Sequence, residues 1–446
     1  MSHRNQLTLL GTKRFLPFFI TQFLGAFNDN IYKNSLLLLV AFAAADSLPF
    51  DSDLFINLAA GLFILPFFLF SGLAGQLADK HEKSLIIRRV KLLEIAIMAL
   101  AAGFIMTENF LVLLLLLFVM GTQSSFFGPV KYSIIPQHLN EHELLGGNAL
   151  VEMGTFVAIL LGTLGAGLLI ELPSATFWIA LSVVLFAILG YLASRAVPEA
   201  RPAAPDLQIN WNLFSETLHV MKQTRDNPTV HKCIIAISWF WALGAAYLTQ
   251  LPNLASEILG GSPQVVSIML AMFTVGVAAG SLFCGRLSSG EVEPGIVPIG
   301  ALGLSLFGID LYYAITPSTT DALLSISQFI DISNNARVLL DLGLIGFFGG
   351  LFIVPLYAMV QQRTEESRRA RAIAALNIQN SFFMVCSAVF GMVFLGVLQR
   401  SIPEFFLTLA LLNMLVCGLL FRLEPEFSRR FVRRFSKKSQ TEGRSD

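Results

Sequence analysis

Apolar runs of about 20 or more residues recur along the whole chain, with short polar stretches between them. A helix that crosses the hydrocarbon core of a bilayer needs about 20 mainly apolar residues. By that measure the pattern predicts twelve spanning helices, at residues 15–45, 53–78, 84–106, 109–130, 144–171, 174–195, 232–256, 263–286, 294–316, 338–361, 372–398 and 403–422. The chain is therefore predicted to be an all-α membrane protein.

A proline-rich stretch separates the sixth run from the seventh. Pro198, Pro202 and Pro205 break any helix there. We expect an N-terminal six-helix bundle over residues 1–196, a linker over 197–231, a C-terminal bundle over 232–422 and a tail over 423–446. Short matches relate the bundles, such as 24–26 with 243–245 and 75–77 with 285–287. Two homologous halves are typical of transporters that rock about a central cavity.

Composition excludes a soluble enzyme. The chain has 446 residues, of which 55% are hydrophobic and 13% charged, against about 25% charged in soluble domains. Thirty basic residues balance thirty acidic ones, and a zero net charge argues against a nucleic-acid partner. With the N-terminus inside, 27 of the 30 basic residues fall on the inner side, Arg337 and Arg400 outside, and Lys33 within a span. Basic loops mark the cytoplasmic side, so both termini are predicted to be cytoplasmic.

Sequence motifs for a cofactor, a metal or enzymatic chemistry are missing. No phosphate-binding loop, no nucleophile with its base and no metal-ligand spacing is present. The four cysteines lie in apolar runs without a Cys-x-x-Cys pair, which favours small core residues over disulfides or zinc. The first apolar run is too long and too polar at its centre for a removable signal peptide. We therefore expect no enzyme, no cofactor and no metal site.

The loop between the second and third runs carries a recognisable motif. Gly75, Asp79, Lys80 and Lys83 resemble the loop signature of the major facilitator superfamily, Gly-x-x-x-Asp-Arg/Lys-x-x-Arg/Lys. Gly75 allows close helix approach, and Asp79 can accept hydrogen bonds from a helix N-terminus and pair with a cation. This predicts a conformational latch, and the alternative is a solvated turn of mixed charge.

Charged residues in the first run are the strongest functional signal. At about 1.5 Å per residue, Asp29 lies ~21 Å along the helix from its start, near mid-membrane. Asp29 and Lys33 are four residues apart and share a helix face, and Asn28 and Asn30 extend the cluster. Charges at that depth are costly and face a cavity or one another. We expect a binding site, the alternative being a neutralised pair that only fixes packing.

Further polar positions lie in other spans: Glu152, Glu94 with Lys91, Lys131 with Tyr132, and Asn377, Gln379 and Asn380. Glu152 is expected to be functional, because a lone acid facing lipid would be expelled. For Lys91, Arg88 and Arg89 the alternative is that basic side chains near a helix end reach out to headgroups. For Asn377 and Asn380 it is interhelical hydrogen bonding.

The later spans carry aromatic rather than ionisable side chains in their middles: Trp239, Phe240, Trp241, Tyr247, Phe382 and Phe383. A cavity that is polar on one wall and aromatic on the other suits a substrate with a head and a tail. A sugar carrier should instead place hydrogen-bonding groups on both walls.

Two amphipathic segments are expected at the inner surface. In the linker, Trp211, Phe214, Leu218 and Met221 recur at helical spacing opposite Glu216, Lys222 and Arg225, typical of a helix lying on the membrane. After the last span, Phe427, Phe431 and Phe435 recur among Arg429, Arg430, Arg433, Arg434, Lys437 and Lys438. That tail is predicted to bind anionic lipid headgroups, the alternative being a simple topology anchor.

Several motifs together resemble the lysophospholipid transporter family of the major facilitator superfamily: residues 22–30, 128–132, 148–152 and 240–241. The similarity runs from about residue 13 to 422. The chain is also similar to the membrane domain of bacterial proteins that fuse such a transporter to an acyltransferase and an acyl-carrier-protein ligase. The resemblance implies inner-membrane movement of lysophospholipids, chiefly lysophosphatidylethanolamine, toward the cytoplasmic leaflet for reacylation. An acyltransferase would then be a separate polypeptide.

The resemblance also implies site residues. Asp29, Asn30, Lys131 and Glu152 match the family's polar motif positions. Some members carry an arginine in the seventh span, and residues 241–250 have none. Lys33, Lys131 or Lys91 remain as cations for the phosphate, and Asp29 or Glu152 would face the ammonium group.

Two other function classes stay open. One is a proton-coupled exporter of drugs or small amphiphiles, with Asp29 or Glu152 as the proton carrier. The other is a non-transporting lipid scaffold for an acyltransferase, which has no need for carboxylates at mid-membrane depth.

Overall fold

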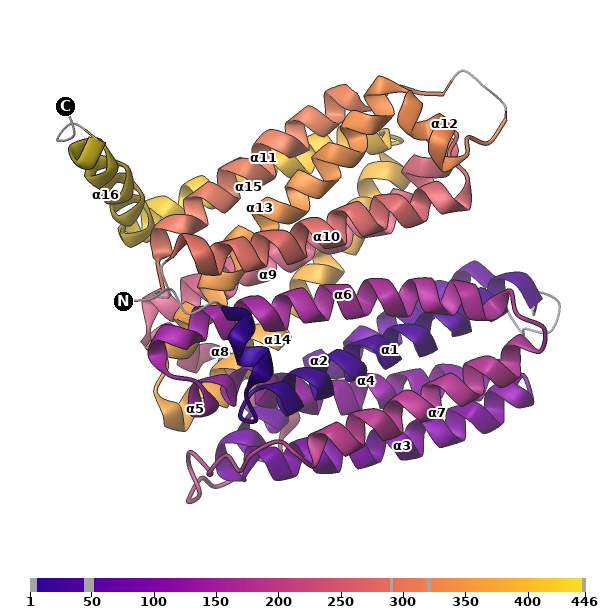
Figure 1. The fold of residues 1–446 in the computed structure, drawn as a ribbon. Coiled ribbons are helices and arrows are strands. Elements are labelled where there is room, and N and C mark those ends of the chain that lie inside the picture. The colour runs from indigo at the N-terminus through magenta and orange to yellow at the C-terminus, as the bar shows by residue number, and fades with distance from the viewer. Residues whose placement is uncertain (1–5, 44–51, 289–291, 319–321, 443–446) are drawn as a thin grey trace.

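The computed structural model describes residues 6–43, 52–288, 292–318 and 322–442 (Figure 1). Every regular element in these ranges is a helix. The long ones are α1 (Leu16–Ala43), α2 (Ser52–Lys80), α3 (Lys83–Met106), α4 (Phe110–Ser133), α6 (Leu144–Ile170), α7 (Ala175–Ser194), α9 (Pro228–Asn253), α10 (Pro263–Leu287), α11 (Val297–Ala314), α13 (Ser333–Arg363), α14 (Arg369–Gly391) and α15 (Ile402–Leu423).

These twelve helices correspond to the twelve predicted spans. Ten described helices are long and apolar enough to cross a membrane by length and composition. The other two, α1 and α3, are equally long but carry polar and charged residues in their middles. The ends differ from the prediction by a few residues. For example, α9 begins at Pro228 because the Asn227 side chain accepts a hydrogen bond from the Val230 amide and caps the helix.

Two groups of helices lie side by side, the N-half (α1–α7) and the C-half (α9–α15) (Figure 1). Within the N-half α1 packs on α6 and α2 on α4, and within the C-half α10 and α11 pack on α13. Between the halves, α14 packs on α2 and α4, and α10 packs on α6. The 3-10 helix η1 (Gln6–Gly11) and the start of α16 (Pro425–Glu442) lie at one end of both halves, here called the terminal side. Away from that side the halves diverge in Figure 1.

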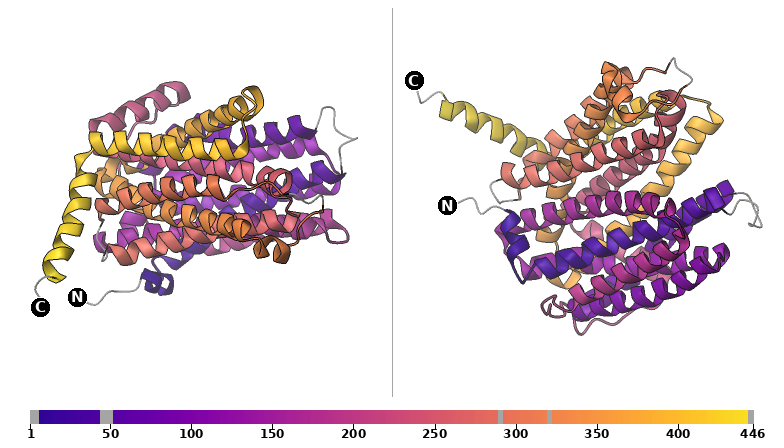
Figure 2. Two further views of the ribbon diagram at one scale, coloured as in Figure 1. Left: turned by 90° about the horizontal axis from the view of Figure 1, so that it is seen from above. Right: turned by 45° about the vertical axis from the view of Figure 1, so that its right-hand side comes forward.

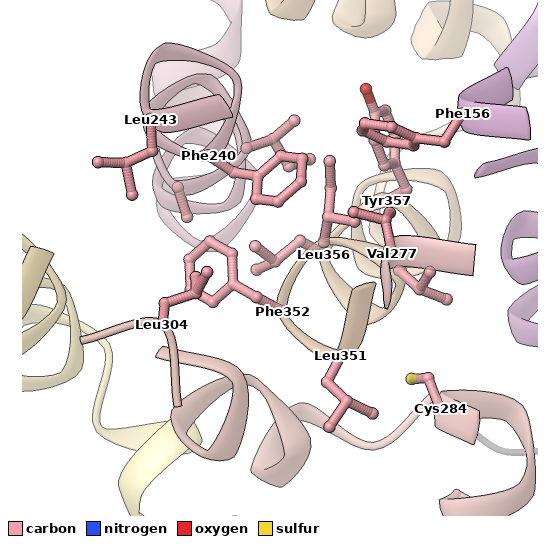
Figure 3. Close-up of a cluster of buried hydrophobic side chains, with 14 of the residues drawn as sticks. Phe156, Phe240, Leu243, Val277, Cys284, Leu304, Leu351, Phe352, Leu356 and Tyr357 are labelled. Atoms are coloured by element: carbon pink, nitrogen blue, oxygen red, sulfur yellow. The ribbon is translucent and has the colours of Figure 1, made fainter. Parts of the chain in front are cut away.

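Glycines let the C-half helices approach closely. A Cβ added at Gly280 would overlap the carbonyl oxygen of Phe347, and one at Gly346 would overlap that of Phe273. Small residues at such positions are the usual means of close helix packing in membranes. Around this contact lies a buried apolar core that includes Phe240 and Phe352 (Figure 3). The helices of the C-half are therefore tightly packed against one another.

The linker forms the predicted helix, α8 (Leu213–Gln223). The Trp211, Phe214 and Leu218 side chains are 60–75% exposed. Glu216, predicted opposite these aromatic side chains, is 3% exposed, and its Cγ lies 3.4 Å from the position of a Cβ at Gly72 of α2. Helix α8 packs on α2 and α14, so the side that carries Glu216 faces the protein and the aromatic side stays exposed. The placement of that aromatic side on the membrane stays a prediction.

Helix α16 leaves the bundle at an angle (Figure 2). Phe427 is buried against Phe421, with 5.9 Å between ring centroids, and Arg363 makes a bidentate ion pair with Glu426, with both bonds at 2.6 Å. The side chains of Arg434, Phe435, Lys437 and Lys438 lie outside the described part, so the prediction for the far tail stays a prediction.

Candidate functional site

A cavity of about 290 Å³ lies between the halves. The N-half contributes polar residues of α1, α3, α4 and α6 to its lining, together with Phe63, Ile64 and Phe67 of α2. The C-half contributes Trp241, Tyr357, Asn377, Asn380, Ser381 and Met384. All four charged residues that line the cavity come from the N-half: Asp29, Lys91, Glu94 and Lys131. The charge asymmetry expected between the two walls is present.

Lys91 and Glu94 form a buried ion pair on α3. The Nζ to Oε2 distance is 2.6 Å and both side chains are 1% exposed. Glu94 also accepts hydrogen bonds from Gln123 Nε2 at 3.2 Å and Asn28 Nδ2 at 3.3 Å. A Cβ at Gly25 would lie 2.5 Å from Lys91 Nζ, so this glycine makes room for the ammonium. The headgroup-reaching alternative is thus wrong for Lys91, whose side chain points inward.

Asp29 has one free oxygen at the cavity. Its Oδ2 accepts a hydrogen bond from Ser124 Oγ at 2.8 Å, whereas the buried Oδ1 has no partner among the described residues. Lys33 Nζ instead lies 5.5 Å from the centre of the Phe63 ring, and no ion pair joins these two described side chains. The alternative of a neutralised Asp29–Lys33 pair therefore does not hold.

Lys131 is the cavity cation without a carboxylate ion pair in the described structure. Its Nζ donates to Thr155 Oγ1 at 2.7 Å and lies 5.0 Å from the centre of the Tyr132 ring. Thr155 in turn donates to Gln22 Oε1 at 3.1 Å. These neutral contacts orient the ammonium and leave its charge available to an anion.

The remaining sequence candidates fall into two groups. Asn30, Trp241, Asn377 and Asn380 line the cavity. The other group lies outside the lining: Asn28 (turned toward Glu94 and Val183), Lys33, Glu152 and Tyr247. Tyr247 packs within the C-half on Phe406, with ring centroids 4.8 Å apart.

The expected aromatic wall is only partly present. Of the six aromatic residues in that expectation, Trp241 alone lines the cavity. Trp239 donates to Asn413 Oδ1 at 2.9 Å within the C-half, Phe240 belongs to the core (Figure 3), and Phe382 is 56% exposed on the outer surface. Sequence spacing does not distinguish these faces, because polar side chains are few around the aromatic residues of α9.

Asp79 of the loop motif reaches the other half. Its buried carboxylate accepts hydrogen bonds from the Ala370 amide at 3.0 Å, the Arg371 amide at 3.3 Å and Arg371 Nε at 3.0 Å. These donors stand at the N-terminus of α14, where the helix dipole favours an anion. A Cβ at Gly75 would lie 2.7 Å from Ala374 Cβ, so this glycine lets α2 contact α14.

The two lysines of the motif lie nearby. Lys80 is half-buried at the end of α2, and Lys83 is 2% exposed at the start of α3. Lys83 Nζ has no hydrogen-bond partner in the described residues.

More contacts close the terminal side. The side-chain amides of Asn148 (α6) and Gln361 (α13) donate to each other at 2.7 and 2.9 Å. Gln6 of η1 donates to the Leu282 carbonyl of α10 at 2.7 Å. Together with the contacts of Asp79, these bonds join the halves on the terminal side of the cavity.

Sequence reasoning missed several lining residues. Gln123 and Ser124 belong to a short polar run in α4, which was the available signal. Tyr357 is one of several aromatic residues in a long apolar run of α13, and nothing in its spacing distinguishes it from core.

Comparisons with known proteins agree with this architecture. The family model of the Major Facilitator Superfamily matches residues 18–332 and 246–442. The lysophospholipid transporter LplT of Escherichia coli O1:K1 / APEC is 27% identical over 398 residues, which cover 86% of this chain and 90% of that protein.

Two solved structures share the fold. The human organic anion transporter MFSD10 (TETRAN) gives a TM-score of 0.70 at 16% identity, covering 92% of this chain and 99% of the other. The E. coli fucose:proton symporter FucP gives 0.67 at 15% identity, covering 93% and 100%. The predicted fold is confirmed: this multi-pass membrane protein belongs to the major facilitator superfamily.

Proposed function

We propose that the protein is a lysophospholipid transporter that moves its substrate across a bacterial inner membrane by alternating access. Its chief substrate is lysophosphatidylethanolamine, delivered to the cytoplasmic leaflet for reacylation. One observation carries the proposal: the N-half wall of the cavity holds an unpartnered carboxylate oxygen on Asp29 and, on Lys131, an ammonium without a carboxylate ion pair. Similarity to the E. coli lysophospholipid transporter supports it.

The headgroup of lysophosphatidylethanolamine is a zwitterion, and the carboxylate of Asp29 and the ammonium of Lys131 have the charges that complement it. Its phosphate binds Lys131 and its ammonium binds Asp29, because charge-assisted hydrogen bonds to such groups are the strong ones. Lys91 is excluded as the phosphate ligand in this state, since Glu94 occupies its ammonium at 2.6 Å. Lys33 is excluded because it lies outside the cavity lining. A net-neutral head on a net-neutral pair of ligands adds no net charge to the cavity.

The acyl chain follows an apolar path between α2 and α14. Phe63 and Phe67 of α2 and Met384 of α14 line the same cavity as the charged residues. On the outer surface of the same two helices, Leu65 is 42% and Phe382 is 56% exposed. We propose that the chain of the lipid leaves the cavity between these helices and stays in the bilayer while the head moves.

The terminal side is cytoplasmic in this proposal, since it carries the basic loops. The structure then represents a state closed toward the cytoplasm. The aromatic face of α8 lies in the inner leaflet and the basic α16 binds anionic headgroups there. An acyltransferase acts as a separate partner, and the halves 1–196 and 232–422 move as bodies about the linker 197–231.

Uptake of labelled lysophosphatidylethanolamine into vesicles containing the purified protein tests the proposal. Asp29→Asn and Lys131→Met each remove one charge at little change in volume. Loss of one charge-assisted bond should lower uptake about 10- to 100-fold. Asp310→Asn is the matched control, because this carboxylate pairs with Arg337 outside the cavity. Wild-type uptake by both cavity variants would refute the headgroup assignment, and lack of uptake by the wild type would refute the substrate.

The second candidate is a proton-coupled exporter of drugs or small amphiphiles. A buried carboxylate with a free oxygen, as in Asp29, is the kind of group that carries protons in transporters. Drug-loaded vesicles with an imposed pH gradient separate the two. Efflux that follows the gradient and is lost in Asp29→Asn supports the exporter, and lipid uptake independent of the gradient supports the flippase.

A further inference from the structure

Two tyrosines, one from each half, stack at the terminal-side end of the cavity. The rings of Tyr132 (α4) and Tyr357 (α13) have centroids 4.3 Å apart and an interplanar angle of 8°. Both residues line the cavity, and both lie in the last turns of their helices on the terminal side. The stack therefore separates the cavity from the closed terminal side.

Each ring is held by a hydrogen bond within its own half. The Tyr132 hydroxyl donates to Glu152 Oε1 of α6 at 2.6 Å. The Tyr357 hydroxyl accepts from Trp241 Nε1 of α9 at 3.1 Å. The halves thus present two oriented rings to each other. This stack, together with the neighbouring stack of Phe156 (α6) on Trp241 (α9), has to break when the halves separate here.

Glu152 stands behind this stack, outside the lining of the cavity. It is 0% exposed. Its Oε1 is occupied by Tyr132, and its Oε2 has no hydrogen-bond partner among the residues described. A headgroup in the cavity meets the Tyr132 ring before it can reach this carboxylate.

We infer that Glu152 is a positioning residue for the gate formed by Tyr132 and Tyr357, and that it neither binds the headgroup nor carries a proton. It fixes the orientation of Tyr132 so that the flat face of the ring meets Tyr357. This inference goes beyond the proposed function, because it concerns the opening of the terminal side and holds for any substrate.

The acceptor oxygen, and not the negative charge, is what the role requires. Glu152→Gln keeps an amide oxygen at the same place, so Tyr132 stays oriented. Glu152→Leu removes the acceptor at similar volume. Tyr132→Phe keeps the ring but removes the donor, and it leaves the carboxylate buried with both oxygens unpartnered. The bond between Tyr132 and Glu152 lies within the N-half and does not itself break on opening. The expected effect is therefore the loss of the stacked contact, a factor of about 2 to 10 in the closed–open equilibrium.

The test measures the gate without substrate. Spin labels are placed at His81 and Glu365, two exposed residues of opposite halves on the terminal side, in a variant lacking the four native cysteines. Distances are recorded by pulsed electron paramagnetic resonance in nanodiscs free of lysophospholipid. We expect Glu152→Leu and Tyr132→Phe to raise the ratio of long to short distances about 2- to 10-fold, because the stacked contact between the rings is lost. Glu152→Gln should keep the wild-type distribution.

Transport assays give the second readout. Under the inference, Glu152→Gln transports with a KM within about twofold of the wild type, whereas Glu152→Leu loses turnover. Equal loss of transport in Glu152→Gln and Glu152→Leu, with unchanged distances, would overturn it and make the carboxylate a ligand or proton carrier. Unchanged distances in Tyr132→Phe would also overturn it, even if Glu152→Leu fails to fold. Because the distances are measured without lysophospholipid, a different substrate would leave this result intact.

Discussion

Replacing Asp79 with alanine should open the terminal side of the transporter. The carboxylate is buried and accepts three hydrogen bonds from the start of α14, two from backbone amides and one from the Arg371 guanidinium. Its removal leaves those donors buried without an acceptor, and Arg371 itself is only 8% exposed. All three bonds join α2 to α14, so they contribute only while the two halves are closed on this side.

The expected magnitude is large. Removing one partner of a buried ion pair costs about 3–5 kcal/mol, because the other charge stays buried. That range shifts an equilibrium between closed and open forms about a hundred- to a few thousand-fold. Inverting a 99:1 population takes about 5.5 kcal/mol. The single substitution should therefore take a predominantly closed ensemble most of the way to an open one.

The distance between spin labels at His81 and Glu365 reports this shift. Asp79→Ala should convert the short distance to a long one, and Asp79→Asn, which keeps one acceptor oxygen, should give a mixture. Asp226→Ala is the control, because its ion pair with Arg368 is 3.6 Å long and exposed, and such pairs contribute about 0–1 kcal/mol. A short distance that persists in Asp79→Ala would refute the latch.

Two further predictions concern other parts of the molecule. Gly25→Ala should displace the Lys91 ammonium, which would lie 2.5 Å from the new Cβ. The overpacking cost of about 1–3 kcal/mol should lower the Tm. Gly103→Ala is the control: nothing lies within 4 Å of its Cβ, so it should leave the Tm unchanged. A polarity-sensitive dye on Phe214→Cys should emit at shorter wavelength in anionic nanodiscs than in detergent, because α8 lies in the leaflet. The same dye on the exposed Glu141→Cys should stay at its wavelength in water, and equal spectra at both positions would contradict the placement of α8.

The fold was predictable because a membrane leaves few choices. Backbone polar groups in lipid must be satisfied within a helix, so twelve long apolar runs become twelve helices. The charge asymmetry of the cavity was predictable for the same reason. Asp29 and Lys131 are too costly to face lipid, and both line the cavity.

The partners of those residues were not predictable. Lys91 is near a helix end, where a lysine can reach the headgroups, and its inward direction depends on space at Gly25 and on Glu94. Asp29 and Lys33 share a helix face, but which neighbour each meets is decided by α2 and α4. The periodicity of a sequence predicts which residues share a helix face, but it does not predict which helix packs against that face.

The prediction that the aromatic residues line the cavity was largely wrong for a related reason. Trp239 and Trp241 are two residues apart on one helix, yet one donates to Asn413 in the C-half core and the other to Tyr357 at the cavity. In an all-round apolar helix no contrast in polarity marks the face toward the substrate. Contacts between halves, such as the Tyr132–Tyr357 stack, lie beyond any local pattern.

The contact of Gln6 with α10 sets a condition on how the protein is made. Its amide donates to the Leu282 carbonyl, 276 residues later in the chain. At about 5–20 residues per second, a ribosome needs roughly 14–55 s to make the acceptor after the donor has been synthesised. During that time η1 has no α10 to bind, and the N-half is inserted without its contacts to the C-half. The terminal-side closure is therefore acquired late in biogenesis, and insertion of the first six helices has to proceed without it.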